Sequence, residues 1–301
     1  MDGSAAQRSF TAVLRDAVRV RDCLALAAVP VLVAAVFLLP METRRALAFA
    51  YHDPTAGSAY AAHFVHFRVE HLAANVLAYV LLAGFGYVLA ALAGYRRLFA
   101  ATAVTFLIAF PPVLSALNLT VPRRAIGYGL SGVNMAFAGL LGVVVVAYAS
   151  QRVDHRIRVR HAPGVFFGAL AITAVVALPS NTVSLAVAAA GVVVASAYFV
   201  SAALAWRTQS RRTPNSGSAF LPDVSSGWFD GGLLGSVLFF GYPFVGFPAR
   251  GAVGGTQVNL YVHLLGFCLG FIVPYVAVSM GLFDADAGVA DSGRGAGDSM
   301  R

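Results

Sequence analysis

The stretch GYGLSGVNMAFAGLLG, from Gly127 to Gly142, is the most informative part of this chain. It lies in a run of 27 residues, 125–151, that carries no charged side chain. A transmembrane helix needs about 20 predominantly apolar residues, so the run predicts a membrane span. The serine between glycines near its start, followed by an asparagine, then requires an explanation other than lipid contact.

The composition of the whole chain is that of an integral membrane protein. Hydrophobic residues make up 59% of it, charged residues 11%, and the mean hydropathy is +0.76. The basic residues are all arginines, which lie in short clusters between apolar runs, as topology-setting charge does. The chain has no basic domain and no interleaving of aromatic and basic residues, which excludes a nucleic-acid partner. Its two cysteines form neither a disulfide framework nor a zinc motif.

Apolar segments along the chain predict an all-α polytopic membrane protein with about eight spans. A kink is expected in the third span at Pro111-Pro112, and a turn at Pro179 to Asn181 divides one long uncharged run into a helical hairpin. The seventh segment has the weakest apolar character, which leaves a count of seven open. The expected spans are 23–40, 66–95, 98–118, 125–150, 163–178, 182–206, 228–247 and 258–282.

The distribution of arginines predicts the orientation in the bilayer. With the N-terminus inside and eight spans, 13 arginines fall on the inner side and six on the outer side, leaving out the tail. This agrees with the positive-inside rule. We therefore expect a cytoplasmic segment at 1–22, a membrane domain at 23–282 and a disordered cytoplasmic tail at 283–301.

Polar side chains inside apolar runs are costly and indicate function. The first such group is HFRVEHLAAN, at the start of the second span. His71 and Asn75 are four residues apart and share one helix face, while His66 lies at the helix entry. The imidazole and the carboxamide could donate hydrogen bonds to one point. The alternative is that these residues only cap the helix at the membrane interface.

The second group is the G-x-S-G motif of the fourth span. Gly129 and Gly132 leave the hydroxyl of Ser131 uncrowded and allow another backbone to approach closely. The alternative is that the serine bonds back to a carbonyl one helical turn earlier. Taken alone, this motif has low specificity.

The third group is HLLGFCLG in the last span. His263, Gly266 and Gly270 lie at positions i, i+3 and i+7, on one helix face. The two glycines form a small-xxx-small surface for close helix packing, which would bring the histidine near a partner helix. The alternative is a histidine satisfied by an unrelated partner.

With eight spans, the second, fourth and last spans run in the same direction, from outside to inside. His71, Asn75, Ser131 and His263 then lie within about two turns of the outer end, with Ser131 on the order of 9 Å below the interface. A neutral imidazole can remove the proton of a serine hydroxyl during nucleophilic attack. No aspartate lies at that depth, so the sequence indicates a Ser–His dyad.

In this order, the three motifs resemble those of the rhomboid family of intramembrane serine proteases. The chain reads H-x4-H-x3-N from His66, G-x-S-G from Gly129, and H-x2-G-x3-G from His263. The resemblance covers 66–150 and 228–282. It implies a six-helix core, so that the hairpin 163–206 is an insertion of two additional helices. Segment 228–247 would correspond to the mobile fifth helix of the family, a lateral gate.

The resemblance also implies an activity: hydrolysis of peptide bonds in or beside transmembrane segments of membrane-protein substrates, without a metal or organic cofactor. Ser131 would be the nucleophile and His263 the general base and then acid. His71, Asn75 and the Ser131 backbone N–H would stabilise the oxyanion, and His66 would be structural. The site would lie near the outer leaflet of the plasma membrane bilayer. No oligomeric state is predicted.

Two features depart from the family pattern. The position four residues after the serine is often aromatic and packs under the catalytic histidine, but here it is Met135. The Trp-Arg pair common in the first outer loop of the family is absent, and Arg44-Arg45 is not a clear substitute.

Other classes of membrane protein are less consistent with the sequence. No H-E-x-x-H zinc motif and no pair of intramembrane aspartates is present. A catalytically inactive rhomboid-like protein that binds membrane helices usually lacks the serine or the histidine, and both are present here. A small-solute transporter is expected to contain an internal repeat with broken helices, which the sequence does not show.

Overall fold

The computed structural model describes residues 10–121, 124–178, 181–212, 226–248, 252–253 and 256–285. Within these ranges the chain is almost entirely helical. Two short antiparallel ladders are the exceptions. One joins β1 (Phe49–Ala50) to β2 (Ile126–Gly127), and the other joins β3 (Ala252–Val253) to β4 (Thr256–Gln257).

Seven helical runs in the described part of the chain are long and apolar enough to cross a membrane. An eighth is formed if α7 (Arg96–Ile108) and α8 (Phe110–Asn118), bent by 49° relative to each other, make one span. The protein is therefore an all-α, multi-pass membrane protein. The seven runs are α2 (Val20–Phe37), α5–η2–α6 (Val69–Tyr79, Val80–Gly84, Phe85–Leu92), α9 (Ser131–Arg152), η3–α10 (Val159–His161, Ala162–Ala177), α11 (Thr182–Arg212), α12 (Ser226–Gly246) and α13 (Leu260–Ser279).

The predicted class is confirmed, and the count of seven or eight spans stays open, because it depends on whether the bent pair α7–α8 is one span. The bend between α7 and α8 lies at Ala109, close to Pro111-Pro112 in the first turn of α8. Proline has no backbone N–H, so these residues cannot continue the hydrogen bonds of α7. The weak segment 228–247 does form a helix, α12. Both helices of the hairpin 163–206 form, as α10 and α11, and most of the turn predicted between them lies outside the described residues.

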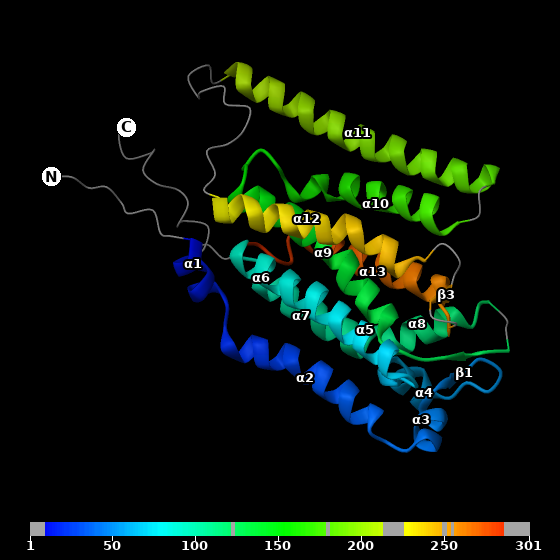
Figure 1. Cartoon of the computed structure of the whole chain (residues 1–301). Coiled ribbons are helices and arrows are strands. Elements are labelled where there is room, and N and C mark those ends of the chain that lie inside the picture. The colour runs from blue at the N-terminus through cyan, green and yellow to red at the C-terminus, as the bar shows by residue number, and fades with distance from the viewer. Residues whose placement is uncertain are drawn as a thin grey trace.

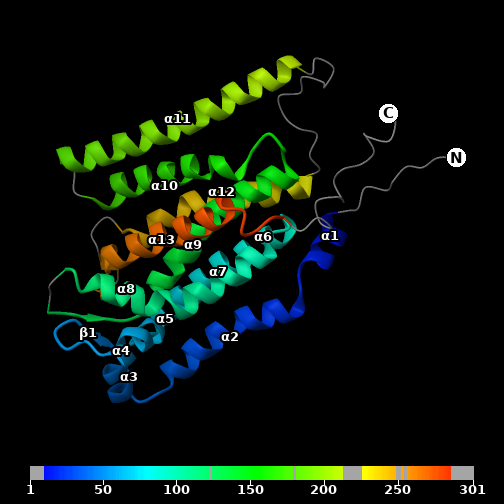
Figure 2. The same ribbon diagram turned by 180° about the vertical axis from the view of Figure 1, so that it is seen from behind.

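Helix α9 is the centre of the molecule, and 94% of the residues in its apolar, membrane-length stretch are buried. Helices α13, α12, α6 and α5 pack around it. Helix α2 lies at one edge and α11 at the opposite edge, where α11 packs chiefly on α10 (Figures 1 and 2). The short helices α3 (Met41–Leu47) and α4 (Ala56–Ala61) gather with β1 and the start of α9 at one end, away from α1 (Phe10–Ala17).

Glycines bring α9 and α13 into backbone contact. A Cβ atom added to Gly266 would meet the carbonyl oxygen of Gly132, and one added to Gly270 would meet that of Ala136. On the facing helix, a Cβ atom at Gly139 would lie 2.6 Å from the backbone nitrogen of Phe271. The predicted small-xxx-small surface of the last span is therefore used for close helix packing.

The predicted start of the fourth span was wrong. Helix α9 begins at Ser131, and the residues before it are extended or in a turn. Residues 126–127 pair with β1, and Gly129 has a φ of 102°, in the left-handed region that a side chain disfavours. Ser131 is therefore the first residue of its helix, and the predicted depth of about 9 Å, which counted helical rise from residue 125, does not hold.

The predicted tail also begins later than expected. Phe283 and Ala285 pack against the core, so at least these residues are ordered, and 286–301 lie outside the described residues. At the other terminus, the segment 1–22 contains helix α1, and α2 begins at Val20.

We expect Gly139→Ala to destabilise the protein, because its methyl group meets backbone atoms of α13 that cannot move independently. Overpacking of this kind costs about 1–3 kcal/mol. The matched control is Gly168→Ala in α10, where the added Cβ atom would lie 3.8 Å from its nearest neighbour, a Phe240 ring atom. Thermal unfolding in detergent should show a lower Tm for Gly139→Ala only. An equal Tm in both variants would contradict the close packing of α9 and α13.

Candidate active site

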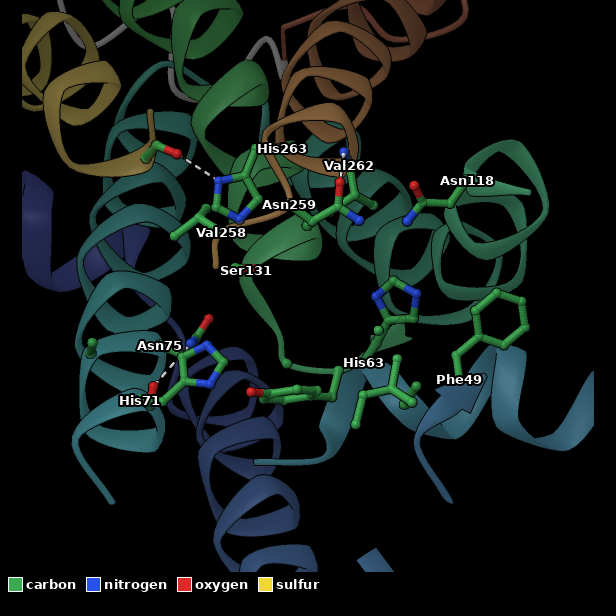
Figure 3. A pocket seen from close by; sticks show the side chains of 18 of the residues that line it. Phe49, His63, His71, Asn75, Asn118, Ser131, Val258, Asn259, Val262 and His263 are labelled. Atoms are coloured by element: carbon green, nitrogen blue, oxygen red, sulfur yellow. Dashed lines mark hydrogen bonds between the residues drawn. The ribbon is translucent and has the colours of Figure 1, made fainter. Parts of the chain in front are cut away.

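A cavity of about 570 Å³ lies at the end of the molecule where α9 begins. The three polar groups of the sequence meet there: His71 and Asn75 from α5, Ser131 from α9 and His263 from α13 all line it. Figure 3 shows His263 above Ser131, with His71 and Asn75 on the left of the cavity and His63 and Asn118 on the right. The predicted convergence of these residues in one place is therefore found.

Ser131 lies at the N-terminus of α9, where the helix offers unpaired donors. The first backbone N–H groups of a helix have no carbonyl partner within it, and the helix dipole adds partial positive charge. Leu130, the residue before Ser131, donates its own N–H to His66 Nε2 at 3.5 Å. Ser131 therefore lies at a helix end whose N–H donors can stabilise the negative charge that develops on an oxygen atom.

His263 is held in a defined orientation in the first turn of α13. Its Nδ1 lies 2.5 Å from the carbonyl oxygen of Gly246, the last residue of α12. A carbonyl oxygen can only accept a hydrogen bond, so Nδ1 carries the hydrogen of the neutral ring. Nε2 then has a lone pair available and is the nitrogen that can act as a base.

His71 and Asn75 lie one turn apart on α5, as predicted. Asn75 Nδ2 donates to the carbonyl oxygen of His71 at 2.9 Å, which uses one of its two N–H groups. Asn134, fully buried on α9, donates to the backbone oxygen of Asn75 at 2.9 Å and to its side-chain oxygen at 3.2 Å. Asn134 therefore fixes the Asn75 carboxamide.

His66 and Gly129 form a layer behind His71. The His66 side chain is fully buried, and its ring centroid lies 4.9 Å from that of His71. A Cβ atom at Gly129 would lie 2.8 Å from Cε1 of His71, so the glycine is needed for the close approach of the ring. His66 thus supports His71 and Leu130, consistent with the structural role predicted for it.

Arg44 is a supporting residue that the sequence analysis did not identify. Its side chain is 9% exposed, and its guanidinium donates to the carbonyl oxygen of His66 at 2.8 Å and to that of Leu39 at 3.1 Å. It also stacks on Phe37, with 4.6 Å between Cζ and the ring centroid. An arginine that ties the loop before α5 to the end of α2 explains why this charge is kept next to an apolar segment.

The ring that packs against His263 does not come from position 135. Met135 is fully buried between Gly266 and Gly246, where its Sδ would lie 2.7 Å from a Cβ added to Gly246. The aromatic neighbour of His263 is Phe247, which follows α12, with 6.2 Å between ring centroids and an interplanar angle of 78°. An aromatic ring therefore packs against His263 from the end of α12 rather than from position 135.

A second Ser–His pair lines the same cavity and was not predicted. His63 Nε2 lies 3.1 Å from the Ser115 hydroxyl, which donates to the carbonyl oxygen of Ala59 at 2.7 Å. Ser115 lies in the interior of α8, where the helix uses the backbone N–H groups, so its own helix offers it no free backbone donor. A polar residue in an apolar helix was the signal that could have identified this pair.

Other polar residues of the cavity were also missed. The Tyr51 hydroxyl accepts hydrogen bonds from Asn118 Nδ2 at 2.9 Å and from Asn259 Nδ2 at 3.1 Å. These contacts link the β1 loop, α8 and the start of α13 at the cavity rim. Asn259 also caps α13, since its side chain accepts from the N–H of Val262.

The cavity extends between α5 and α12. Its lining includes Ala74 and Ala78 of α5 and Tyr242 and Val245 of α12, and Val245 is 71% exposed. The small side chains of Ala74 and Ala78 therefore line the same cavity as Ser131. Among the described residues, no group of three or more His, Cys, Asp or Glu side chains is arranged to hold a metal ion.

Comparison of the chain with protein-family models, with curated proteins and with solved structures finds no match. The site itself and the three sequence motifs are therefore the basis for inferring a function.

Stability is expected to fall between about pH 6.5 and pH 4 because of His63, which lies outside the spans. Burial lowers its pKa to about 4, although a backbone hydrogen bond at Pro111 acts in the opposite direction. Below pH 6.5 the unfolded chain binds a proton that folded His63 excludes, so unfolding becomes more favourable. The difference between the unfolded and folded pKa values of His63 corresponds to a loss of at most about 3 kcal/mol in the free energy of unfolding.

The measurement is thermal unfolding in detergent against pH for wild type and His63→Gln. The variant should show a shallower loss of Tm over this range, because glutamine does not titrate. Parallel curves for the two proteins would mean that His63 does not contribute.

Proposed function

We propose that this chain is an intramembrane serine endopeptidase of the rhomboid type, which cleaves peptide bonds in or next to transmembrane segments of membrane-protein substrates. One observation carries the proposal. Ser131, at the start of a helix, shares a buried cavity with His263, whose Nδ1 is occupied by a carbonyl and whose Nε2 is therefore available as a base. The order of the three motifs along the chain supports the same family.

The proposed reaction follows the chemistry of a Ser–His dyad. Ser131 Oγ attacks the carbonyl carbon of the scissile peptide while His263 Nε2 takes the hydroxyl proton. The C–N bond then breaks as the protonated His263 gives that proton to the leaving amine. Water attacks the acyl-enzyme ester, its proton passes to His263, and the Ser131 hydroxyl is restored. No metal or organic cofactor takes part in these steps.

The oxyanion formed at each tetrahedral stage needs donors on the side away from His263. Ser131, Asn75 and His71 all line the cavity, and we assign this role to the Ser131 backbone N–H, the second N–H of Asn75 Nδ2 and the ring of His71. Nδ1 of His71 is buried and has no hydrogen-bond partner among the described residues. This ring can therefore donate to a substrate oxygen without breaking an existing bond.

The membrane helix of a substrate needs lateral access to the cavity. The opening between α5 and α12 provides a route from lipid to Ser131, and α12 is the helix proposed to move as a gate. The clusters of arginines near α1, α7, the end of α9 and η3 favour a cytoplasmic position for that end. We accordingly place the active site near the outer leaflet, in the plasma membrane.

We expect purified protein in liposomes to cleave a model transmembrane substrate and to react with a fluorophosphonate probe at Ser131. Ser131→Ala and His263→Ala should each reduce cleavage by about 10³-fold or more, since each removes a member of the dyad. Rates are measured from the appearance of the cleaved fragments, and labelling is measured by mass spectrometry of the modified peptide.

Ser115→Ala is the matched control, because it removes the other serine hydroxyl of the cavity that lies near a histidine. This variant should retain both labelling and cleavage. Loss of cleavage in Ser115→Ala, with activity kept in Ser131→Ala, would instead assign the nucleophile to the Ser115–His63 pair. Absence of labelling in folded wild type would favour a helix-binding protein without catalysis.

Asn75→Ala should lower cleavage by about 10²-fold, the usual effect of removing one oxyanion donor. Asn118→Ala is the control, since it removes a carboxamide from the far side of the same cavity. Steady-state kinetics should place the loss for Asn75→Ala in kcat. Equal losses in both variants would indicate general damage to the cavity and contradict the assignment of Asn75.

A further inference from the structure

The hydrogen bond between His263 Nδ1 and the Gly246 carbonyl joins two different helices. Gly246 ends α12, and His263 lies in the first turn of α13, separated from it by the segment that contains β3 and β4. In hydrolases with a Ser–His–Asp triad, a carboxylate occupies the position of this carbonyl and keeps the imidazole in the productive tautomer. Here the partner is a main-chain group.

A helix terminus is suited to this role. The last carbonyl groups of a helix have no intrahelical partner, so the Gly246 oxygen is available to accept from His263. The aligned peptides of α12 also place partial negative charge at its C-terminus, beside the ring that takes up the serine proton. Both effects depend on where the end of α12 lies relative to α13.

Two buried side chains locate that end. Met135 of α9 packs against Gly246, with its Sδ 2.7 Å from where a Cβ atom would be, so any larger residue at 246 requires Met135 or the helix end to shift. Phe247 follows Gly246, and its ring packs against both His263 and Phe267, with centroids 6.2 and 6.4 Å apart. The Phe247 N–H donates to the carbonyl oxygen of Pro243, which closes the last turn.

We propose that Gly246 is a positioning residue of the site, because its carbonyl at the C-terminus of α12 sets the tautomer of His263. His263 can then act as a base only while that end of α12 packs against Met135. The inference rests on the proposed function of Ser131 and His263. Displacement of α12 for substrate entry breaks the bond, and its return restores the base. Chemistry is then confined to the state in which α12 has closed again.

The bond is tested directly by ¹⁵N NMR of histidine-labelled full-length protein in liposomes at neutral pH. The His263 signals are assigned by difference from His263→Gln. We expect Nδ1 to be protonated and Nε2 to be unprotonated in wild type. A wild-type ring with the hydrogen on Nε2 overturns the proposal, whatever the activity.

The dependence on position is tested with Gly246→Val, whose side chain displaces the helix end from Met135. It should lower fluorophosphonate labelling and cleavage by about tenfold or more and mix the His263 tautomers. Gly241→Val is the matched control, since it lies on the same helix and a Cβ atom there has no neighbour within 4 Å. It should behave as wild type.

Rescue separates positioning from misfolding. Met135→Ala removes three heavy atoms and valine adds three, so Gly246→Val with Met135→Ala should regain both the tautomer and most of the activity. A loss of activity in Gly246→Val with an unchanged tautomer overturns the proposal. If the wild-type protein neither reacts with the fluorophosphonate nor cleaves the substrate, the proposed protease function fails. The wild-type NMR spectrum still decides whether the bond to Gly246 sets the tautomer of His263.

Discussion

The backbone contact between α9 and α13 is the constraint on which the other features depend. Gly139, Gly266 and Gly270 allow the two helices to approach until carbonyl groups of one lie where side chains of the other would be. Association in a membrane is driven by such packing, because lipid offers no hydrophobic gain for burying apolar side chains. This contact brings the first turn of α13, with His263, next to the first turn of α9, with Ser131.

The non-helical segments before α9 and α5 position the residues of the site as much as the helices do. Gly129 adopts a conformation that ends the extended entry to α9 and makes room for His71. The β1–β2 ladder and the Arg44 guanidinium hold the surrounding loops in place. His71, Asn75 and Ser131 therefore line one cavity, with the Asn75 side chain held by Asn134.

The sequence predicted the spans and the residues that meet in the cavity because both depend on local patterns. Apolar length marks the helices, and polar residues such as His71 and His263 stand out against it. It did not predict the start of α9 at Ser131, the role of Arg44 or the His63–Ser115 pair. These depend on contacts between segments that are far apart in the chain, for which a single sequence carries no periodic signal. The family resemblance pointed to position 135 for an aromatic neighbour of His263, and nothing in the sequence pointed to Phe247.

The position of His263 on α13 has a consequence for biogenesis. Membrane proteins emerge from the ribosome in order, so Ser131 enters the bilayer well before the helix that carries its proposed base. On the proposed mechanism, a chain still in the translocon would contain Ser131 and the proposed oxyanion donors but not yet His263. On the proposed mechanism, newly made copies therefore stay inert toward neighbouring nascent membrane proteins until synthesis of the membrane domain is complete.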